Sequence, residues 1–358
     1  MKKIIVTNAG RGAAINFCRS LRLVPEEYYI IGLEDNKYSI MNVEADETYL
    51  SPSVESPYYL EFLKEIISRT GADFLYASKT NEELWTISRH RDELDIKTFL
   101  PEDDIIDVYE DKFKTYELMK KEGIKLPDTI LVTDKDILKK FMDKYGEIWL
   151  RAIKGCGGKG SISTDNFEFA VNWIDNFNGW GNFTAAELLS KKTATWSGIW
   201  NNGELIVSQI RERKYWEFSY LSLSGVTGIT GAQITRKDKE LDELAIKCIN
   251  AIHSKPHGIV SVDFCYDFNG VPNPTEIQAS RFYTSSYFMA KAGLNLPHIM
   301  LKTAFGEEID EINEKFSPLP ENLLWIKYVD CEPVLTTVDE IEKNVKVLEE
   351  LVNDKGWE

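Results

Sequence analysis

Two short segments about a hundred residues apart place the strongest constraint on this chain. The first, residues 151–160, packs four glycines and three cations into one loop. The second, residues 260–281, holds Asp263 and Glu276 near predicted strand ends, followed by Gln278. Successive glycines let backbone N–H groups close over phosphate oxygens, and carboxylate and carboxamide oxygens are the ligands that Mg²⁺ prefers. Together the two segments predict a site for a metal-bound nucleotide phosphate.

Residues 1–108 alternate between apolar strand patterns and helical patterns. Alternation of this kind predicts a parallel sheet with helices on both faces. We therefore expect a Rossmann-like domain over this part of the chain. The strands expected in it lie at 3–7, 28–33, 73–77 and 97–100.

Changes in pattern divide the rest of the chain into three further units. Residues 109–183 combine helices with a strand, the glycine loop and a returning strand, which predicts a small α+β unit. Residues 184–310 hold further strands and both acids of the second segment. Residues 311–358 form an extension with an amphipathic helix expected at 338–352.

Composition narrows the class of protein. The chain has 358 residues and a formal net charge of −16, which argues against broad nucleic-acid binding. No run of about eighteen apolar residues occurs, so no membrane span is expected. The five cysteines form no CxxC pair, which favours a reducing cytoplasm, and the first residues lack a signal-peptide pattern. The four histidines show no metal-ligand spacing, so structural roles are expected for them.

The hypothetical metal site depends on how two strands pair. In the first strand Asp263 alternates with apolar neighbours, and in the second Glu276 and Gln278 share a face. If the turn at 267–274 makes these strands a hairpin, the acids come within reach of one or two Mg²⁺ ions, with Mn²⁺ as an alternative. Otherwise the acids are solvated residues on an outer face.

Arginines near this segment allow two interpretations each. Arg281 could hold a γ-phosphate or an anionic intermediate in a bidentate grip, or it could form a surface ion pair. The cluster of Arg211, Arg213 and Lys214 is either a solvated turn or a clamp for a substrate carboxylate. The sequence leaves both questions open.

A glycine turn near the N-terminus suggests a different function. Residues 8–15 open the first helix, and Glu34 and Asp35 follow about twenty residues later, as in dinucleotide-binding folds. Ile15 stands where the third glycine of that fingerprint belongs. The turn therefore predicts either NAD(P) binding or a tight strand-to-helix connection in a scaffold.

The order of these parts resembles the ATP-grasp superfamily, in particular the carbamoyl-phosphate-synthase-like carboxylate–amine ligases, over roughly residues 1–308. The resemblance implies an ATP-grasp fold, with α/β and α+β parts, preceded by the Rossmann-like parallel-sheet domain. Its N-terminal subdomain would be residues 109–183 with the glycine loop as a lid, and its C-terminal subdomain residues 184–310. The metal ligands would be Asp263, Glu276 and Gln278, and Arg281 would be catalytic.

The resemblance also implies a nucleotide-binding set. It contains a helix-opening lysine, a strand arginine, the lid residues and a hinge that presents backbone and a glutamate to adenine. These residues are Lys112, Arg151, Lys154, Gly157, Gly158, Lys159, Gly160, Glu187, Leu188 and Leu189.

Three positions depart from the family pattern. Gln278 stands where asparagine is usual, and Asp263 replaces the commoner glutamate. No ribose-binding acid follows the hinge, where Thr195 occurs instead.

The function implied is an ATP-dependent, C–N bond-forming ligase. It would join a small carboxylate, an amino acid among the candidates, to an amine through an acyl-phosphate, releasing ADP and phosphate. Its cofactors would be ATP and Mg²⁺, its partners these small-molecule substrates, with no nucleic acid or membrane. A homodimer is expected from many relatives. The alternatives are an NAD(P)-dependent oxidoreductase and a non-catalytic ATP-binding protein of the same fold.

Overall fold

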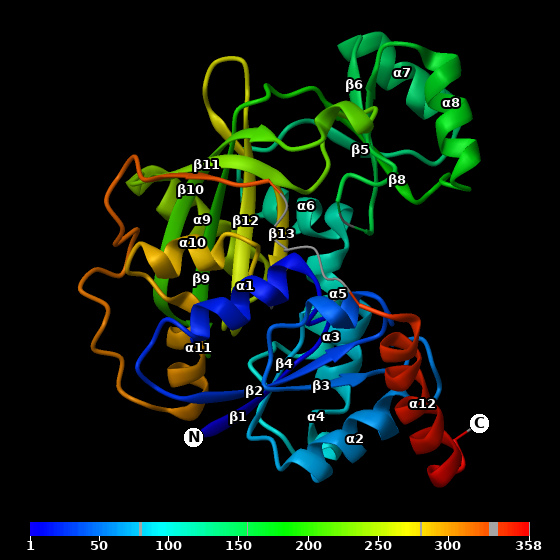
Figure 1. The fold of residues 1–358 in the computed structure, drawn as a ribbon. Coiled ribbons are helices and arrows are strands. Elements are labelled where there is room, and N and C mark those ends of the chain that lie inside the picture. Colours follow the sequence, from blue (N-terminus) through cyan, green and yellow to red (C-terminus); the bar gives the residue numbers. More distant parts are fainter. Residues whose placement is uncertain (79–80, 156, 280, 329–335, 358) are drawn as a thin grey trace.

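The computed structural model describes residues 1–78, 81–155, 157–279, 281–328 and 336–357. Within these residues the chain forms a parallel four-stranded sheet, an antiparallel six-stranded sheet and an antiparallel four-stranded sheet. Figure 1 shows the parallel sheet at the bottom, the six-stranded sheet at the upper left and the second four-stranded sheet as a small lobe at the upper right. The expected fold class is confirmed.

The N-terminal domain is built on four parallel strands in the order β3-β2-β1-β4. Its sheet is buried on both faces because successive side chains of a strand point to opposite sides. Ile4 packs with helices α1 and α11 on one face, and Ile5 packs with α2 and α3 on the other. The elements are β1 (Lys2–Val6), α1 (Gly12–Leu21), β2 (Tyr28–Glu34), β3 (Glu47–Leu50), α2 (Tyr59–Thr70), β4 (Phe74–Tyr76), α3 (Asn81–Arg89) and α4 (Arg91–Leu94).

One expected strand of this domain was wrong. Residues 97–100 make only an isolated bridge between Lys97 and Phe74. The backbone N–H of Leu75 donates to the Lys97 carbonyl at 2.9 Å, but Pro101 follows shortly and the chain turns into a helix. A short run before a proline therefore does not extend the sheet.

The small lobe is an antiparallel sheet, order β5-β8-β6-β7, with two helices packed on one face. β8 pairs with β5 and β6, so residues on both sides of position 183 belong to this one sheet. Two connecting helices lead into the lobe. The elements are α5 (Asp103–Glu110), α6 (Lys112–Lys121), β5 (Thr129–Leu131), α7 (Lys135–Tyr145), β6 (Ile148–Ala152), β7 (Ile162–Thr164), α8 (Phe167–Asn176) and β8 (Phe183–Glu187).

The six-stranded sheet has one apolar face and one face that is polar around Asp263 but apolar toward the N-terminal domain, where Ile199 and Ile259 are buried. Trp196, Val262 and Ile277 pack against α9 in a buried core. The side chains that alternate with these residues along each strand point to the other side of the sheet. The strand order is β13-β12-β9-β10-β11-β14. The elements are β9 (Thr193–Asn201), β10 (Glu204–Trp216), β11 (Thr230–Arg236), α9 (Lys239–Ile252), β12 (Gly258–Tyr266), β13 (Pro272–Ala279), α10 (Ser286–Lys291), α11 (Leu296–Phe305) and β14 (Leu324–Ile326).

The C-terminal extension returns to the N-terminal domain. After β14 has paired with β11, the helix expected at 338–352 is present as α12 (Val338–Lys355). Its Leu351 is buried in the core of the N-terminal domain, and Trp357 stacks on Tyr58 with ring centroids 5.8 Å apart. Figure 1 shows α12 beside β3 and α2. The extension therefore contacts both large parts of the molecule.

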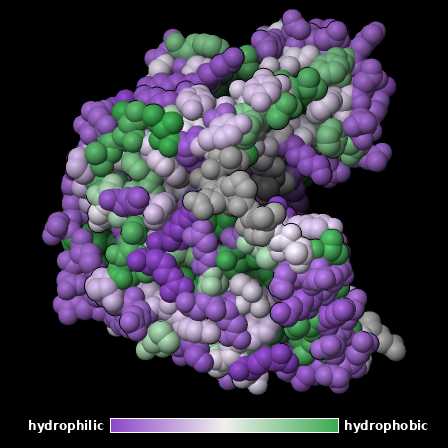
Figure 2. All heavy atoms as spheres, viewed as in Figure 1, coloured by the Kyte–Doolittle hydropathy of each residue, from purple (hydrophilic) through white to green (hydrophobic). Residues whose placement is uncertain are grey.

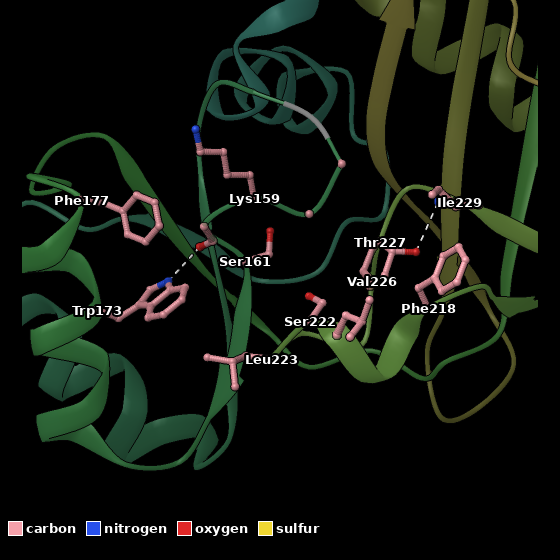
Figure 3. A pocket seen from close by; sticks show the side chains of 14 residues that line it. Lys159, Ser161, Trp173, Phe177, Phe218, Ser222, Leu223, Val226, Thr227 and Ile229 are labelled. Carbon is pink, nitrogen blue, oxygen red and sulfur yellow. Dashed lines mark hydrogen bonds between the residues drawn. The ribbon is translucent and has the colours of Figure 1, made fainter. Parts of the chain in front are cut away.

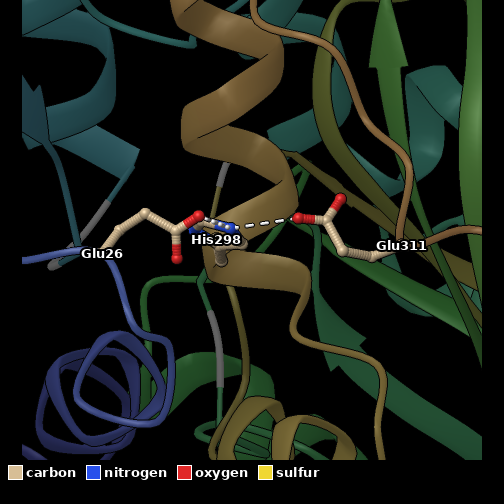
Figure 4. Close-up of side chains that lie close together, drawn as sticks. All are labelled: Glu26, His298 and Glu311. Carbon is tan, nitrogen blue, oxygen red and sulfur yellow. Dashed lines mark ion pairs between the residues drawn. The ribbon is translucent and has the colours of Figure 1, made fainter.

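A polar group also joins the N-terminal domain to α11 (Figure 4). His298 is 3% exposed, and its Nε2 lies 3.3 Å from Glu311 and 3.7 Å from Glu26. Its Nδ1 shares a 2.8 Å hydrogen bond with the Tyr28 hydroxyl. The side chains of Glu26, His298 and Glu311 lie close enough together to bind a metal ion. The Lys302 ammonium, however, already pairs with Glu311 at 2.7 Å. The group is a polar tie between domains, in agreement with a structural histidine.

Figure 2 shows that hydrophilic side chains cover most of the face seen in Figure 1, and that a hollow separates the small lobe from the N-terminal domain at the right. In the part of the chain that the structure describes, every helix is too short or too polar to cross a membrane.

We predict that one buried carboxyl makes stability depend on pH. Burial raises the pKa of Asp242 to about 6, although Trp196 Nε1 donates to it at 2.7 Å. The unfolded value is about 4, so the stability linked to this proton is full below pH 4 and is lost as pH rises through about 6. Asp242→Asn keeps the acceptor for Trp196, and should raise the free energy of unfolding by about 1–2 kcal/mol at pH 8 with little effect at pH 4.

Thermal unfolding at pH 4 and pH 8 would measure this difference. Glu243→Gln, an exposed residue of the same helix, is the control and should leave the pH profile unchanged. If Asp242→Asn lowered stability equally at both pH values, burial of the ionised carboxyl would not be what destabilises the protein at high pH.

Candidate nucleotide and metal site

The polar face of the six-stranded sheet carries a row of side chains at one level. Glu276 lies directly opposite Asp263, Asp263 opposite Thr195, and Thr195 opposite Arg211. Directly opposite residues of antiparallel strands have Cβ atoms about 4.5–5.5 Å apart, so the two carboxyls are neighbours. The hairpin on which the predicted metal site depends is therefore present.

Hydrogen bonds orient these acids. Thr195 Oγ1 donates to Asp263 Oδ1 at 2.5 Å, and Gln278 Nε2 donates to Glu276 Oε1 at 2.9 Å. The Tyr283 hydroxyl in turn donates to Gln278 Oε1 at 3.0 Å. Each carboxyl keeps a second oxygen for a cation, and the Gln278 carbonyl keeps a lone pair. This set of oxygens fits Mg²⁺.

A lysine reaches the acids from the adjoining helix. Asp111 caps α6 by accepting from two backbone N–H groups, which places Lys112 in the first turn. Its Nζ lies 3.6 Å from Glu276 Oε1 and donates to the Gly155 carbonyl at 2.6 Å. Lys112 therefore links the metal-site strand to the start of the glycine loop.

Arg151 of β6 approaches the same edge of the large sheet. One of its terminal nitrogens donates to the Thr275 carbonyl at 2.6 Å. Burial lowers the pKa of this guanidinium, and the charges of Glu276 and Asp263 oppose the shift. A buried cation held beside two acids is well placed to bind a phosphate that also contacts their metal.

The glycine loop reaches across to the loop between β10 and β11. A cavity of about 480 Å³ lies between residues 157–161 and 218–229, with Trp173 and Phe177 at one side (Figure 3). Gly158 has φ +75°, and a Cβ there would lie 2.6 Å from the Val226 carbonyl oxygen. Only glycine allows this close approach of two backbones without strain. The loop therefore spans the gap between the small lobe and the large sheet.

The remaining lid and hinge residues lie farther from the acids. Lys154 and Lys159 are exposed, and Lys154 Nζ lies 3.9 Å from Glu110. Glu187 ends β8, where its side chain accepts from the Asp128 backbone N–H at 3.2 Å. The next two residues, Leu188 and Leu189, lead from the small lobe into the large sheet. The segment 187–189 thus lies between the two antiparallel sheets, and the Ser190 N–H that follows it donates to the Tyr266 carbonyl of β12 at 2.9 Å.

Arg281 lines a second cavity, of only about 20 Å³. Lys112, Gly155, Glu276, Gln278 and Arg281 all line it, as does Leu84 of the N-terminal domain. The adjoining Phe282 is tied to that domain because its backbone N–H donates to the Tyr76 hydroxyl at 2.8 Å. Predicted residues from three separate segments of the chain therefore meet at the junction of the three sheets.

The sequence missed three features of the site. From the sequence, Thr195 was named only as the residue that replaces an expected ribose-binding acid. The alternation of Thr193, Thr195 and Ser197 nevertheless indicates a polar strand face. The orienting role of Tyr283 has no local signal. The partner of the lid, residues 218–229, is marked only by closely spaced glycines.

Several solved structures have a fold similar to that of this chain. The biotin carboxylase domain of Hydrogenobacter thermophilus 2-oxoglutarate carboxylase, in complex with MgADP, has a TM-score of 0.69 and 16% identity over 90% of this chain and 73% of that one. An L-amino acid ligase from Bacillus licheniformis has a TM-score of 0.65 and 12% identity over 85% and 74%. N5-carboxyaminoimidazole synthetase from Staphylococcus aureus has 0.65 and 15% over 99% and 86%.

The chain has the ATP-grasp fold. Identities of 12–16% establish the fold alone. No family model matches the sequence, and no curated protein matches it significantly. The Rossmann-like domain in front of the ATP-grasp part was also expected and is confirmed.

We predict that Gly158→Ala releases the lid of this ATP-grasp fold from its partner loop. The added Cβ meets the Val226 carbonyl at 2.6 Å, so the two backbones must separate. Amide hydrogen exchange followed by mass spectrometry should become faster in residues 222–228.

Gly157→Ala is the matched control, because Gly157 also has a positive φ but a Cβ there meets nothing within 4 Å. Both variants carry a backbone cost of about 1–2 kcal/mol from the left-handed conformation. Equal exchange rates in the two variants would mean that the lid does not depend on this contact.

Proposed function

We propose that this protein is an ATP-dependent ligase that joins a small carboxylate to an amine through an acyl-phosphate. The observation that carries the proposal is the cross-strand pair Asp263 and Glu276, with Lys112 and Arg151 beside it and a glycine loop across the gap. The fold supports it, since one similar structure is an L-amino acid ligase and another is a complex with MgADP.

The chemistry asks mainly for positioning and charge neutralisation. A carboxylate oxygen forms a bond to the γ-phosphorus while the bond to the β–γ bridging oxygen breaks and ADP leaves. The amine nitrogen then attacks the acyl carbon, phosphate departs, and the amine loses a proton to solvent. Both steps proceed without a nucleophilic side chain. This agrees with a site made of acids, cations and amides.

Each expected residue has a role in this scheme. Asp263, Glu276 and Gln278 would hold Mg²⁺, which neutralises phosphate charge when bound; Mn²⁺ has the same ligand preference. Lys112 and Arg151 would hold the α- and β-phosphates. Arg281, in the cavity next to Glu276, would stabilise the transferring phosphoryl group or the tetrahedral intermediate.

The lid and hinge would contact the rest of the nucleotide. The amides of Gly157, Gly158 and Gly160, with Lys154 and Lys159, would close over the phosphates. The backbone of residues 187–189 would receive adenine between the two sheets. Closure onto residues 218–229 would exclude water from the acyl-phosphate.

The oxidoreductase alternative is disfavoured by the N-terminal turn. The Gly10 N–H donates to Glu34 at 3.0 Å, and Glu34 is fully buried. A Cβ at Gly10 would lie 2.1 Å from the Ser39 carbonyl oxygen, so the turn is closed against its own domain. The acid that would bind a ribose in a dinucleotide site is thus used to hold the turn. The non-catalytic alternative is disfavoured by the candidate metal ligands and the loop cations, which a degenerate site need not keep.

Two wider expectations belong to the same proposal. Cys18, Cys248 and Cys265 are free, which is the pattern of a reducing compartment, so we propose the cytoplasm. We also propose a homodimer, as in the biotin carboxylase domain described as a dimer. Light scattering of the purified protein would test the second point.

A phosphate-release screen of carboxylate and amine pairs with Mg·ATP tests the reaction. ADP and phosphate should form only when both substrates are present. Thermal shifts with Mg·ATP and with NADH separate the nucleotide classes, and stabilisation by NADH alone would reject the ligase. Tight Mg·ATP binding without ADP release across the whole panel would indicate the non-catalytic alternative.

We predict that Glu276→Ala removes a metal ligand and lowers turnover by a factor equivalent to several kcal/mol of transition-state stabilisation, on the order of a thousandfold. Steady-state ADP release measures it. Glu204→Ala, an exposed residue of the same sheet, is the control and should keep wild-type turnover. Wild-type turnover in Glu276→Ala would reject the metal assignment.

Arg281→Ala should lower kcat by about 10²-fold or more while the dissociation constant of Mg·ATP stays within about threefold of wild type, because the interaction forms mainly in the transition state. Steady-state kinetics and calorimetry measure the two quantities. An unchanged kcat with weaker nucleotide binding would instead assign Arg281 to ground-state binding.

A further inference from the structure

Two arginines of β10 lie on the polar face of the large sheet. The sequence left Arg211 and Arg213 as either a solvated turn or a carboxylate clamp. β10 continues through both residues to Trp216, so they are not in a turn. Arg211 is only 4% exposed, and it lies across β9 from Asp263 in the polar row. Glu212, between them, faces the other side and pairs with Lys214 and Arg236.

Arg211 is buried with donors that lack acceptors. One of its terminal nitrogens donates to Gln233 Oε1 at 2.9 Å. Arg211 Nε and Gln233 Nε2 find no hydrogen-bond partner among the described residues, although both atoms are buried. A buried donor without an acceptor costs about 1–3 kcal/mol, and more when the group is charged. Both orphaned atoms are donors, so an anion would satisfy both.

Arg213 is likewise without a negative partner. Its nitrogens donate to the neutral hydroxyls of Thr230 and Thr193, each at 2.9 Å, and its guanidinium lies 3.6 Å from the Trp216 ring centroid. Burial, and then the charge of Arg213, lowers the pKa of Arg211 to about 10, while Asp263 opposes this shift. Within the described residues, neither arginine forms an ion pair with a carboxylate. The neighbourhood therefore has an excess of positive charge.

The position of the pair relative to the acids decides which anion fits. Lys112 and Arg151 approach at β13, the opposite edge of the polar row. Neighbouring strands lie about 4.8 Å apart, so β10 runs about 10 Å beyond the strand of Asp263. The metal acids thus lie between two groups of cations. In phosphoryl transfer the attacking and leaving oxygens are in line. If the nucleotide is held at β13, the substrate that accepts the phosphoryl group must therefore lie on the β10 side.

We propose that Arg211 and Arg213 bind the carboxylate group of the substrate that is phosphorylated. This inference rests on the proposed ligase function and names its acceptor site. A guanidinium matches a carboxylate with two parallel hydrogen bonds, which fits the unused donor of Arg211 and the amide of Gln233. Tyr283 lies beneath the Arg211 guanidinium, 5.2 Å away at the ring centroid, and its hydroxyl donates to Gln278. The carboxylate site is thereby connected to the metal ligands.

The loop that follows β10 encloses this site. Trp216 pairs with Thr230 at the end of the hairpin, and residues 218–229 beyond it meet the glycine lid at Val226. Closure of the lid would cover the arginine pair together with the nucleotide. The carboxylate and the phosphoryl group would then share one water-poor space.

The test is direct binding of acetate, the minimal carboxylate, with and without saturating Mg·ADP. Carbon-13 NMR of labelled acetate should show saturable binding to the wild-type protein. Arg211→Met and Arg213→Met should each weaken it by about tenfold or more, since each removes a charged donor. The dissociation constant of Mg·ATP should change by less than about threefold, because the nucleotide contacts lie at β13.

Arg236→Met is the matched control, because Arg236 lies in the same sheet but pairs with Glu212 away from the polar row. Arg211→Lys retains the charge and should recover part of the acetate affinity. Absence of saturable acetate binding, equal affinities in wild type and both methionine variants, or an equal loss in Arg236→Met would each overturn the inference. So would an equal loss of Mg·ATP or inorganic phosphate binding, which would assign the pair to a phosphoryl group.

These outcomes are separate from the fate of the ligase proposal. If acetate binding depends on the arginines but no substrate pair leads to ADP release, the carboxylate site is supported and the ligase reaction is contradicted. If Arg211→Met changes neither kcat nor the KM for the carboxylate in ADP release, the ligase reaction is supported and the carboxylate site is contradicted. Thermal unfolding of every variant checks that it folds.

Discussion

The register between β12 and β13 is the constraint on which the proposed site depends. A shift of one residue would exchange the two faces of a strand. Val262 and Ile277 are buried in the core against α9, so the burial of apolar area fixes the pairing. Asp263 and Glu276 are thereby held side by side on the opposite face, where their charges repel each other. The hydrophobic core offsets this repulsion and leaves a pair of acids ready for a cation.

The charges around this pair follow from which parts of the chain meet there. Arg151 comes from the small lobe and Lys112 from α6, which packs against α9 and β13, whereas Arg211 and Arg213 come from the same sheet as the acids. Each group of cations therefore has a different mechanical relation to the metal ligands. The contact of Arg151 would form and break if the lobe moved, while contacts within the sheet would keep their geometry. A mobile nucleotide end and a fixed acceptor end suit a reaction that binds two substrates in turn.

Local sequence patterns predicted strands and hairpins, but not the contacts between segments that are far apart in the chain. β1, β2, β4 and the β12–β13 hairpin follow from apolar patterns, whereas the sequence predicted no strand at β3. The strand expected at 97–100 failed because a sheet edge needs a long-range partner over several residues, and only Lys97 finds one. Arg211 and Arg213 stayed ambiguous because Glu212 and Lys214 make the segment look solvated, and only the register reveals which face each occupies. The contact of Gly158 with Val226 joins segments that no local pattern relates.

The return of α12 to the N-terminal domain has a consequence for turnover. Leu351 is buried in that domain, and Ile199 and Ile259 of the six-stranded sheet share a buried core with its first strand and helix, so these two parts form one base. The chain passes between the small lobe and this base at residues 122–128, after α6, and at residues 188–192. In the proposed reaction, departure of ADP would then need only the small lobe to move, while the acyl-phosphate would stay on the base to meet the amine.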